Sequence, residues 1–143
     1  MKKLEHEEIK YKLIVIGDGN VGKTSIINRF KTNQFTGNYE PTVGLDFQSI
    51  PIIIDDQSVT LLLYDTAGQE KFRSLIPLYT KDAHIILLIY DISNYDSFTN
   101  IEKWYDSLSN INNLRTYVKN KFHLKHSNFL MVLYLIMMNI HRT

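Results

Sequence analysis

One segment constrains the fold of this chain more than any other. A mostly apolar run at residues 11–16 leads into G-x-x-x-x-G-K-T at Gly17–Thr24, and amphipathic residues follow at Ile26, Ile27 and Phe30. A strand, a glycine-rich turn and a helix in this order form the phosphate-binding P-loop. The glycines let backbone N–H groups converge on an anion, and the helix N-terminus adds its positive dipole. A glycine-rich turn without a ligand is the alternative.

The side chains of this loop suit a bound polyphosphate with its metal ion. Lys23 places a cation on the terminal phosphates, and the Thr24 hydroxyl is placed to bind Mg²⁺. The predicted phosphate-binding residues are the loop and the start of its helix, Gly17, Asp18, Gly19, Asn20, Val21, Gly22, Lys23, Thr24 and Ser25.

A second group of residues supplies what the first loop lacks. Asp65 ends an apolar strand, where it can hold Mg²⁺ through water. Gly68 can bring a backbone N–H to a terminal phosphate, and Gln69 can orient an attacking water. Each of these residue types is common at strand ends and in turns. Their conjunction with the P-loop predicts a site that acts on the terminal phosphate.

The remaining pattern indicates an α/β sheet in a chain of single-domain size, 143 residues. Residues Thr32 to Thr42 indicate a surface loop. Leu45–Ile54 and Ser58–Tyr64 indicate a hairpin, and Pro51 places the first of these strands at a sheet edge.

A continuously apolar segment, His84–Asp91, predicts a strand buried on both faces of a parallel sheet. Ser93 or Asn94 can cap the helix that follows. Apolar positions recur at helical spacing in that helix, so we expect Trp104 and the tyrosines beside it in the core; these positions are Phe98, Ile101, Trp104, Tyr105 and Leu108.

Composition divides the chain. All 15 acidic residues lie at or before Asp106, whereas five of the 16 basic residues follow it. An apolar run at Phe129–Met138 is too short to span a bilayer, and it suits a buried strand or helix. The chain has no cysteine, and the charged start of the sequence lacks a signal-peptide pattern, so a cytoplasmic protein is expected.

Taken together, Gly17–Thr24 and Asp65–Glu70 resemble the Ras superfamily of small GTPases, which implies the P-loop NTPase fold with a Ras-like mixed sheet flanked by helices. Val43–Phe47, Lys71–Leu75 and Leu88–Ser93 resemble segments specific to Rab proteins, and Arg73–Tyr79 is similar to the Golgi-acting Rab-six subgroup.

This resemblance implies a switch in vesicle-mediated protein transport that binds GTP and GDP with Mg²⁺ and hydrolyses GTP slowly. Thr42 matches a threonine that coordinates Mg²⁺ and senses the γ-phosphate. Phe35 matches an aromatic residue that stacks on guanine, and Tyr39 one that covers the phosphates. Gln69 and Lys23 are the implied catalytic residues, and an activating protein is expected to supply an arginine worth about 10³ to 10⁵ in rate.

The implied partners are effectors, an exchange factor and a GTPase-activating protein, which contact Val43–Phe47 and Gln69–Tyr79; no nucleic acid is expected. Gly19 is smaller than the residue of many Rab proteins and leaves room for a partner's catalytic group. Tyr64 replaces a tryptophan usual in the family, and with Phe47 and Tyr79 it is expected to form an aromatic patch that selects effectors.

The resemblance covers roughly residues 10–113 and stops near Asn113. We therefore expect a charged extension at 1–9, a partial GTPase domain at 10–113 and a divergent basic and apolar tail at 114–143. The sequence has no Asn-Lys-x-Asp string, which in the family recognises guanine, and no prenylatable cysteine, so we expect no lipid anchor in this chain, in contrast to a Golgi-associated full-length relative. A truncated, non-catalytic Rab fragment and an ATP-using P-loop enzyme remain alternatives.

Overall fold

The computed structural model describes residues 8–34, 37, 42–54, 56–68, 70–108 and 115–120. In chain order its helices and strands are β1 (Ile9–Ile16), α1 (Lys23–Thr32), β2 (Leu45–Ile54), β3 (Gln57–Thr66), the 3₁₀ helix η1 (Glu70–Leu75), α2 (Ile76–Thr80), β4 (Ile85–Tyr90), α3 (Tyr95–Thr99), α4 (Ile101–Asp106) and β5 (Arg115–Asn120).

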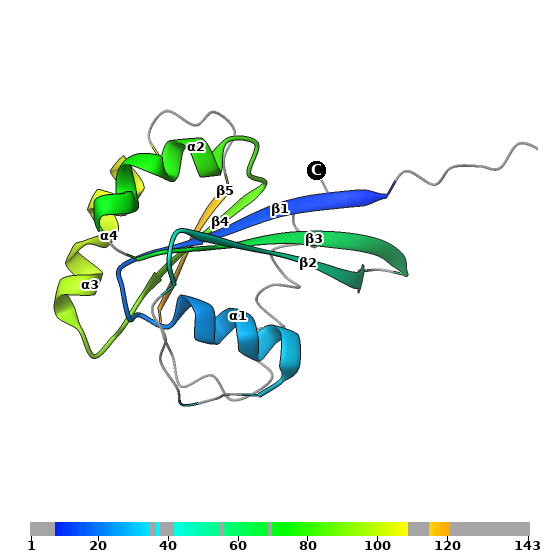
Figure 1. The fold of residues 1–143 in the computed structure, drawn as a ribbon, viewed down its shortest axis with the longest axis horizontal. Coiled ribbons are helices and arrows are strands. Elements are labelled where there is room, and N and C mark those ends of the chain that lie inside the picture. Colours follow the sequence, from blue (N-terminus) through cyan, green and yellow to red (C-terminus); the bar gives the residue numbers. More distant parts are fainter. Residues whose placement is uncertain are drawn as a thin grey trace, which may run out of the picture.

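The strands form one five-stranded sheet in the order β2-β3-β1-β4-β5 (Figure 1). Only the β2–β3 pair is antiparallel in this sheet; β1 is parallel to both β3 and β4, and β4 is parallel to β5. Helix α1 covers one face, and α2, α3 and α4 lie on the other (Figure 1). This mixed sheet flanked by helices confirms the predicted fold class.

Alternating residues of β1 separate two apolar cores, because successive strand side chains point to opposite faces. Leu13 and Val15 pack with Ile27 of α1 in one core. Ile14 and Ile16 pack with Trp104 of α4 in the other. Strand β4 is buried on both faces, as its unbroken apolar sequence predicted. The P-loop follows β1 directly, so it begins at the end of a strand that has an apolar core packed on each face.

The predicted hairpin is confirmed, and β2 lies at the sheet edge. Pro51 pairs opposite Thr60 in the antiparallel register. An edge strand can accommodate a proline because one side of its backbone has no ladder to complete. Strand β3 runs from Gln57 to Thr66 and is longer than the predicted Ser58–Tyr64, and Asp65 lies near its carboxyl end as expected.

The predicted helix after β4 is divided into α3 and α4, which meet at Asn100. Asn94 is the N-cap, and its side chain accepts hydrogen bonds from the backbone N–H groups of Asp96 and Ser97. Trp104 is fully buried as expected, but Tyr105 is 57% exposed, so its prediction as a core residue was wrong. Ile101, Trp104 and Leu108 share the face that packs in the core, and Tyr105 lies beyond the edge of that face.

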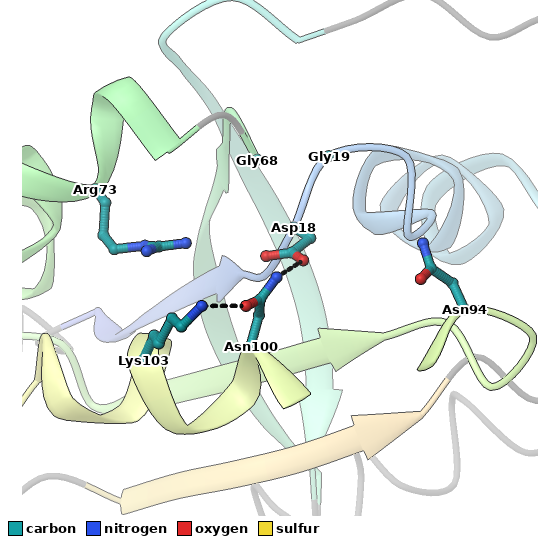
Figure 2. Close-up of a pocket in the computed structure, with 7 residues that line it drawn as sticks. All are labelled: Asp18, Gly19, Gly68, Arg73, Asn94, Asn100 and Lys103. Atoms are coloured by element: carbon teal, nitrogen blue, oxygen red, sulfur yellow. Dashed lines mark hydrogen bonds between the residues drawn. The ribbon is translucent and has the colours of Figure 1, made fainter. Parts of the chain in front are cut away.

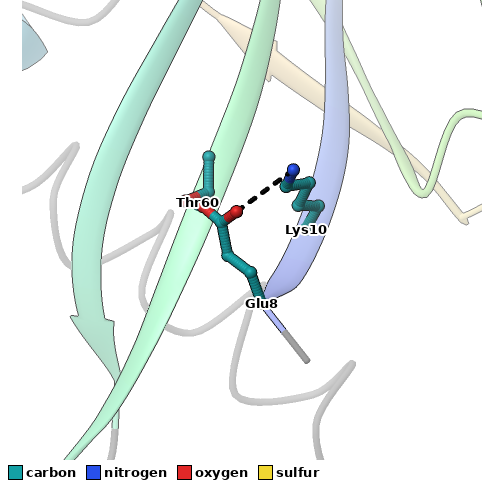
Figure 3. A network of polar contacts seen from close by, with 3 residues as sticks. All are labelled: Glu8, Lys10 and Thr60. Carbon is teal, nitrogen blue, oxygen red and sulfur yellow. Dashed lines mark hydrogen bonds and ion pairs between the residues drawn. The ribbon is translucent and has the colours of Figure 1, made fainter. Parts of the chain in front are cut away.

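A small polar network lies at the beginning of β1 (Figure 3). Glu8 accepts a hydrogen bond from the Thr60 hydroxyl of β3, and its carboxylate lies 3.1 Å from Lys10 Nζ. The Thr60 hydrogen bond and then Lys10 hold the pKa of Glu8 below its ordinary value of 4.5. Both elements of the parallel β1–β3 pair are therefore tied together at their amino ends.

Strand β5 extends the sheet beyond the region expected to carry the domain. It pairs in parallel with β4 through the register from Ile85 opposite Arg115 to Tyr90 opposite Asn120. The apolar run at 129–138, which was considered as a substitute strand, lies outside the described residues. The division of the chain near residue 113 stays a prediction. No helix in the described part of the chain is long and apolar enough to cross a bilayer.

Candidate functional site

The first loop has a backbone that only glycine fits at its start. Gly17 has φ 145°, and a Cβ there would lie 2.1 Å from the carbonyl oxygen of Ile89 in β4. Gly22 has φ 92° and immediately precedes α1. These conformations are strained for residues with a side chain. They turn the chain from the carboxyl end of β1 directly into a helix N-terminus.

Lys23 lies at the centre of this turn. Its side chain is only 5% exposed, and Nζ donates to the carbonyls of Gly17 at 2.9 Å and Asp18 at 2.6 Å. Burial lowers the pKa of Lys23 to about 8, and the nearby Asp65 and Asp18 carboxylates oppose that shift. The amine therefore remains mostly protonated at neutral pH, as a cation held inside the loop.

Three residues predicted to bind the metal meet beside the loop. The Thr24 hydroxyl lies 2.7 Å from the Thr42 hydroxyl and donates to Oδ2 of Asp65. Asp65 is 2% exposed because the parallel β1–β3 register places it opposite Val15, at the end of the P-loop strand. Burial raises the pKa of Asp65, and the Thr24 hydrogen bond and Lys23 oppose that shift. Thr42 is 18 positions and Asp65 is 41 positions from Thr24 in the sequence, yet both side chains contact the Thr24 hydroxyl.

The donor set fits Mg²⁺. Oδ1 of Asp65 is buried and has no hydrogen-bond partner, which is a costly state for a carboxylate oxygen and one that a cation would relieve. Mg²⁺ prefers oxygen ligands and is usually bound by one or two carboxylates together with substrate phosphates. Among the residues that the structure describes, no group of three or more His, Cys, Asp or Glu could hold a metal ion by itself.

Gly68 brings the second predicted loop against the first. A Cβ at Gly68 would lie 2.4 Å from the Asp18 carbonyl and from the backbone nitrogen of Gly19. Only a glycine permits this approach of two backbones. The structure therefore places Gly68 beside the P-loop, where the prediction put it.

The other residues predicted to bind nucleotide divide into those that the structure describes and those that lie outside the described residues. Val21 is 1% exposed and packs in the core with α1, so its side chain acts structurally. Asn20 takes a left-handed conformation with φ 62°. Phe35, Tyr39 and Gln69 lie outside the described residues, and their assigned roles stay predictions.

Sequence reasoning missed the surroundings of the Asp18 side chain. One carboxylate oxygen accepts from Asn100 Nδ2 at 2.7 Å (Figure 2), and the other accepts from Trp104 Nε1 at 2.6 Å. Beside these groups is a cavity of about 410 Å³, lined by Asp18, Gly19, Gly68, Arg73, Asn94, Asn100 and Lys103. An acidic residue inside a phosphate-binding loop was the available signal, because such a charge needs donors of its own.

The segments predicted to meet partners expose apolar side chains. Val43 is 84% exposed, Phe47 51% and Leu78 68%. Within the predicted aromatic patch, the rings of Phe47 and Tyr64 lie 5.0 Å apart between centroids. Tyr79 is partly buried and packs on the core beneath α2. Apolar exposure of this kind is typical of protein-binding surfaces.

Comparison with known proteins identifies the family. The sequence matches the Ras family over residues 12–132. Ypt/Rab-type GTPase avaA of Emericella nidulans is 44% identical over 69 residues, which are 48% of this chain and 34% of that protein. Ras-related proteins Rab-7b and Rab-7a of Paramecium octaurelia are each 51% identical over 65 residues, 46% of this chain and 32% of theirs. The matches to these curated relatives thus span about a third of their length. Because the family match covers most of the sequence and the fold agrees with it, the chain belongs to the Ras family.

Proposed function

We propose that the chain is a Rab-type small GTPase switch, which binds GTP or GDP with Mg²⁺ and hydrolyses GTP slowly. The observation that carries this proposal is the convergence of Thr24, Thr42 and Asp65 beside Lys23, with Oδ1 of Asp65 buried and unpaired. A phosphate-binding loop alone would not need this oxygen cluster. Its three members come from α1, the segment before β2, and β3.

Each residue has a role that follows from its position. The inward backbone N–H groups of the loop and the Lys23 amine bind phosphate oxygens. Thr24, Thr42 and Asp65 would hold Mg²⁺ directly or through water, and the ion would neutralise charge on the β- and γ-phosphates. Gln69 would orient the attacking water. Hydrolysis would stay slow until an activating protein supplies a cation.

Two loops would sense the γ-phosphate, one on each side of the P-loop. Thr42 reaches the site from the segment before β2, and Gly68 reaches it from the end of β3. Loss of the γ-phosphate would remove the group that Thr42 and Gly68 are expected to contact, and both loops would relax. Because exposed Val43 and Phe47 adjoin the first loop and Leu78 follows the second, effectors, an exchange factor and an activating protein would read this change.

Competition between nucleotides tests the proposal. A fluorescent GDP analogue is bound to the purified chain with Mg²⁺, and unlabelled GTP or ATP is then added. Displacement by GTP at concentrations far below those needed for ATP is the expected result. Preference for ATP would favour the adenine-using alternative. Lack of binding at micromolar nucleotide would favour a non-catalytic fragment that acts by occupying Rab partners.

Compartment and pathway are finer questions. A role in vesicle-mediated transport is supported by the Rab relatives. The Golgi assignment depends on the resemblance of Arg73–Tyr79 to the Rab-six subgroup, and it gains no support from relatives named Rab-7a and Rab-7b. It stays a prediction, to be tested by imaging the tagged native protein against Golgi markers.

A further inference from the structure

Asp18 connects the phosphate-binding loop to the helical layer on the other face of the sheet. Trp104 Nε1 donates to Oδ1 of its carboxylate, and Asn100 Nδ2 donates to Oδ2. Lys103 Nζ donates to Oδ1 of Asn100 at 2.9 Å, which orients the Asn100 amide toward Asp18 (Figure 2). Each carboxylate oxygen therefore has its own donor, and all three supporting residues belong to α4 or its cap.

The backbone of Asp18 serves the binding site itself. Its carbonyl accepts the shorter of the two hydrogen bonds from the Lys23 amine, at 2.6 Å compared with 2.9 Å for Gly17. Gly68 packs against the same carbonyl group. The side chain of Asp18 is thus held by α4, while its main chain positions the cation that meets the phosphates.

Trp104 also contacts the segment that follows Gly68. The Arg73 guanidinium of η1 lies over the Trp104 ring, 4.6 Å from its centroid. Arg73 Nε is buried and has no hydrogen-bond partner among the described residues, and the ring face of Trp104 offers the guanidinium a favourable cation–π contact. Arg73 also lines the cavity beside Asp18, which leaves it space to shift (Figure 2).

We propose that Trp104 is a positioning residue that couples η1 to the P-loop: its N–H holds Asp18, and its ring holds Arg73. A movement of η1 would then change the hold on Asp18 and, through its carbonyl, on Lys23. This inference deepens the proposed nucleotide switch and rests on it for its functional consequence. The coupling itself is a property of the protein without ligand.

The first test needs no nucleotide. Asp18→Asn, Trp104→Phe and the double variant of the full chain are unfolded in denaturant. Trp104→Phe keeps an aromatic ring at this buried position but loses the indole N–H together with part of the ring volume, and Asp18→Asn removes the carboxylate that the N–H meets. If the N–H holds Asp18, the two changes should be non-additive. Additive changes in unfolding free energy would overturn the link between Trp104 and Asp18, whether or not the chain binds GDP.

The second test uses emission from Trp104, the only tryptophan in the chain. Arg73→Gln should shift this emission in the ligand-free protein, whereas Lys31→Gln, at an exposed position of α1, should not. In the unsubstituted chain, exchange of GDP for a non-hydrolysable GTP analogue should also change the emission, and Arg73→Gln should remove that response. Unchanged emission in ligand-free Arg73→Gln would overturn the contact with η1.

The third test measures release of a fluorescent GDP analogue. Trp104→Phe and Asp18→Asn should each release it about tenfold faster, equivalent to about 1.4 kcal/mol. Tyr105→Phe, the exposed neighbour, should release it at the original rate. Equal rates for all variants would refute the positioning role. If the unsubstituted chain binds no GDP, the proposed function fails, and the first two tests still decide the coupling.

Discussion

At the scale of single residues, the site depends on glycines that no residue with a Cβ could replace and on one buried carboxylate oxygen. Gly17 and Gly68 are required by the close approach of other backbones, whereas a Cβ at Gly37 would meet nothing within 4 Å. Asp65 supplies a buried oxygen without a partner. The P-loop string predicted Gly17 and Lys23 directly. It did not predict the donors to Asp18, because Asn100 and Trp104 lie 82 and 86 positions away.

Gly17→Ala should lower the free energy of unfolding by at least about 2 kcal/mol, because it combines a strained φ with a clash against β4. Gly37→Ala is the matched control and should change it by less than about 0.5 kcal/mol. Chemical denaturation of the two variants measures both values. Similar stabilities for the two would contradict the close approach of Gly17 to Ile89.

Asp65→Asn should remove most of the Mg²⁺ dependence of GDP binding, since an amide is a much weaker Mg²⁺ ligand than a carboxylate. We expect affinity in Mg²⁺ to fall at least about tenfold, and affinity in a chelator to change little. Asp82→Asn, an exposed acid outside the site, is the control. Isothermal titration with and without Mg²⁺ gives the comparison, and retained Mg²⁺ dependence would exclude Asp65 as a ligand.

At the scale of elements, periodicity predicted strands well and helix faces less well. The apolar sequence of β4 correctly predicted that this strand is buried on both faces. Pro51 correctly predicted that β2 lies at the edge of the sheet. The α3–α4 region was read as one helix, and Tyr105 was therefore assigned to the wrong side. Ile101, Trp104 and Leu108 form the apolar stripe that packs in the core, and Tyr105 lies just beyond the edge of that stripe, where the spacing alone does not decide burial.

Helix α1 packs on the sheet through the apolar side chains of Ile26, Ile27 and Phe30. Ile27 is 1% exposed, so Ile27→Ala should lower the unfolding free energy by about 2–5 kcal/mol. Ile53 in β2 is 76% exposed, and Ile53→Ala should change it by no more than about 0.5 kcal/mol. Denaturant unfolding of the pair measures both. Equal losses would argue against the packing of α1 on the sheet.

The tie between β1 and β3 at Glu8 should be visible by titration. Because the folded-state pKa of Glu8 lies below its ordinary value, its stabilising effect is present above that ordinary value and is lost as pH falls through the lowered pKa. Thr60→Val removes the largest cause, so the pKa should rise toward 4.5. NMR titration of the Glu8 carboxyl measures it; an unchanged pKa would place the cause elsewhere.

At the scale of the whole molecule, the site lies where two layers and two loops meet. Family strings predicted the sheet and the phosphate side of the site, because these depend on local sequence and strand register. Recognition of the guanine base could be predicted only as far as stacking on Phe35, because the sequence has residues that suit phosphates and a metal ion but no Asn-Lys-x-Asp string. The pairing of β5 with β4 was also missed, because six mixed residues carry no strong alternation.

Binding should stabilise the entire fold. GDP with Mg²⁺ at about 100 times its dissociation constant should raise the unfolding free energy by about 2.7 kcal/mol. ADP at the same concentration should produce little change. Thermal unfolding followed by circular dichroism gives the shift for both ligands. An equal shift with ADP would contradict guanine preference while leaving phosphate binding intact.

The parallel register of β1 and β3 determines where the Asp65 carboxylate lies in the predicted metal site. Asp65 reaches Thr24 only because it lies opposite Val15, on the face covered by α1. One residue inserted between Val59 and Asp65 would turn the carboxylate to the opposite face, beneath α2 and α4. Changes in length are therefore far more dangerous within β3 than at the hairpin turn before it. Keeping the number of residues between Val59 and Asp65 therefore matters as much to the metal site as the identity of Asp65 itself.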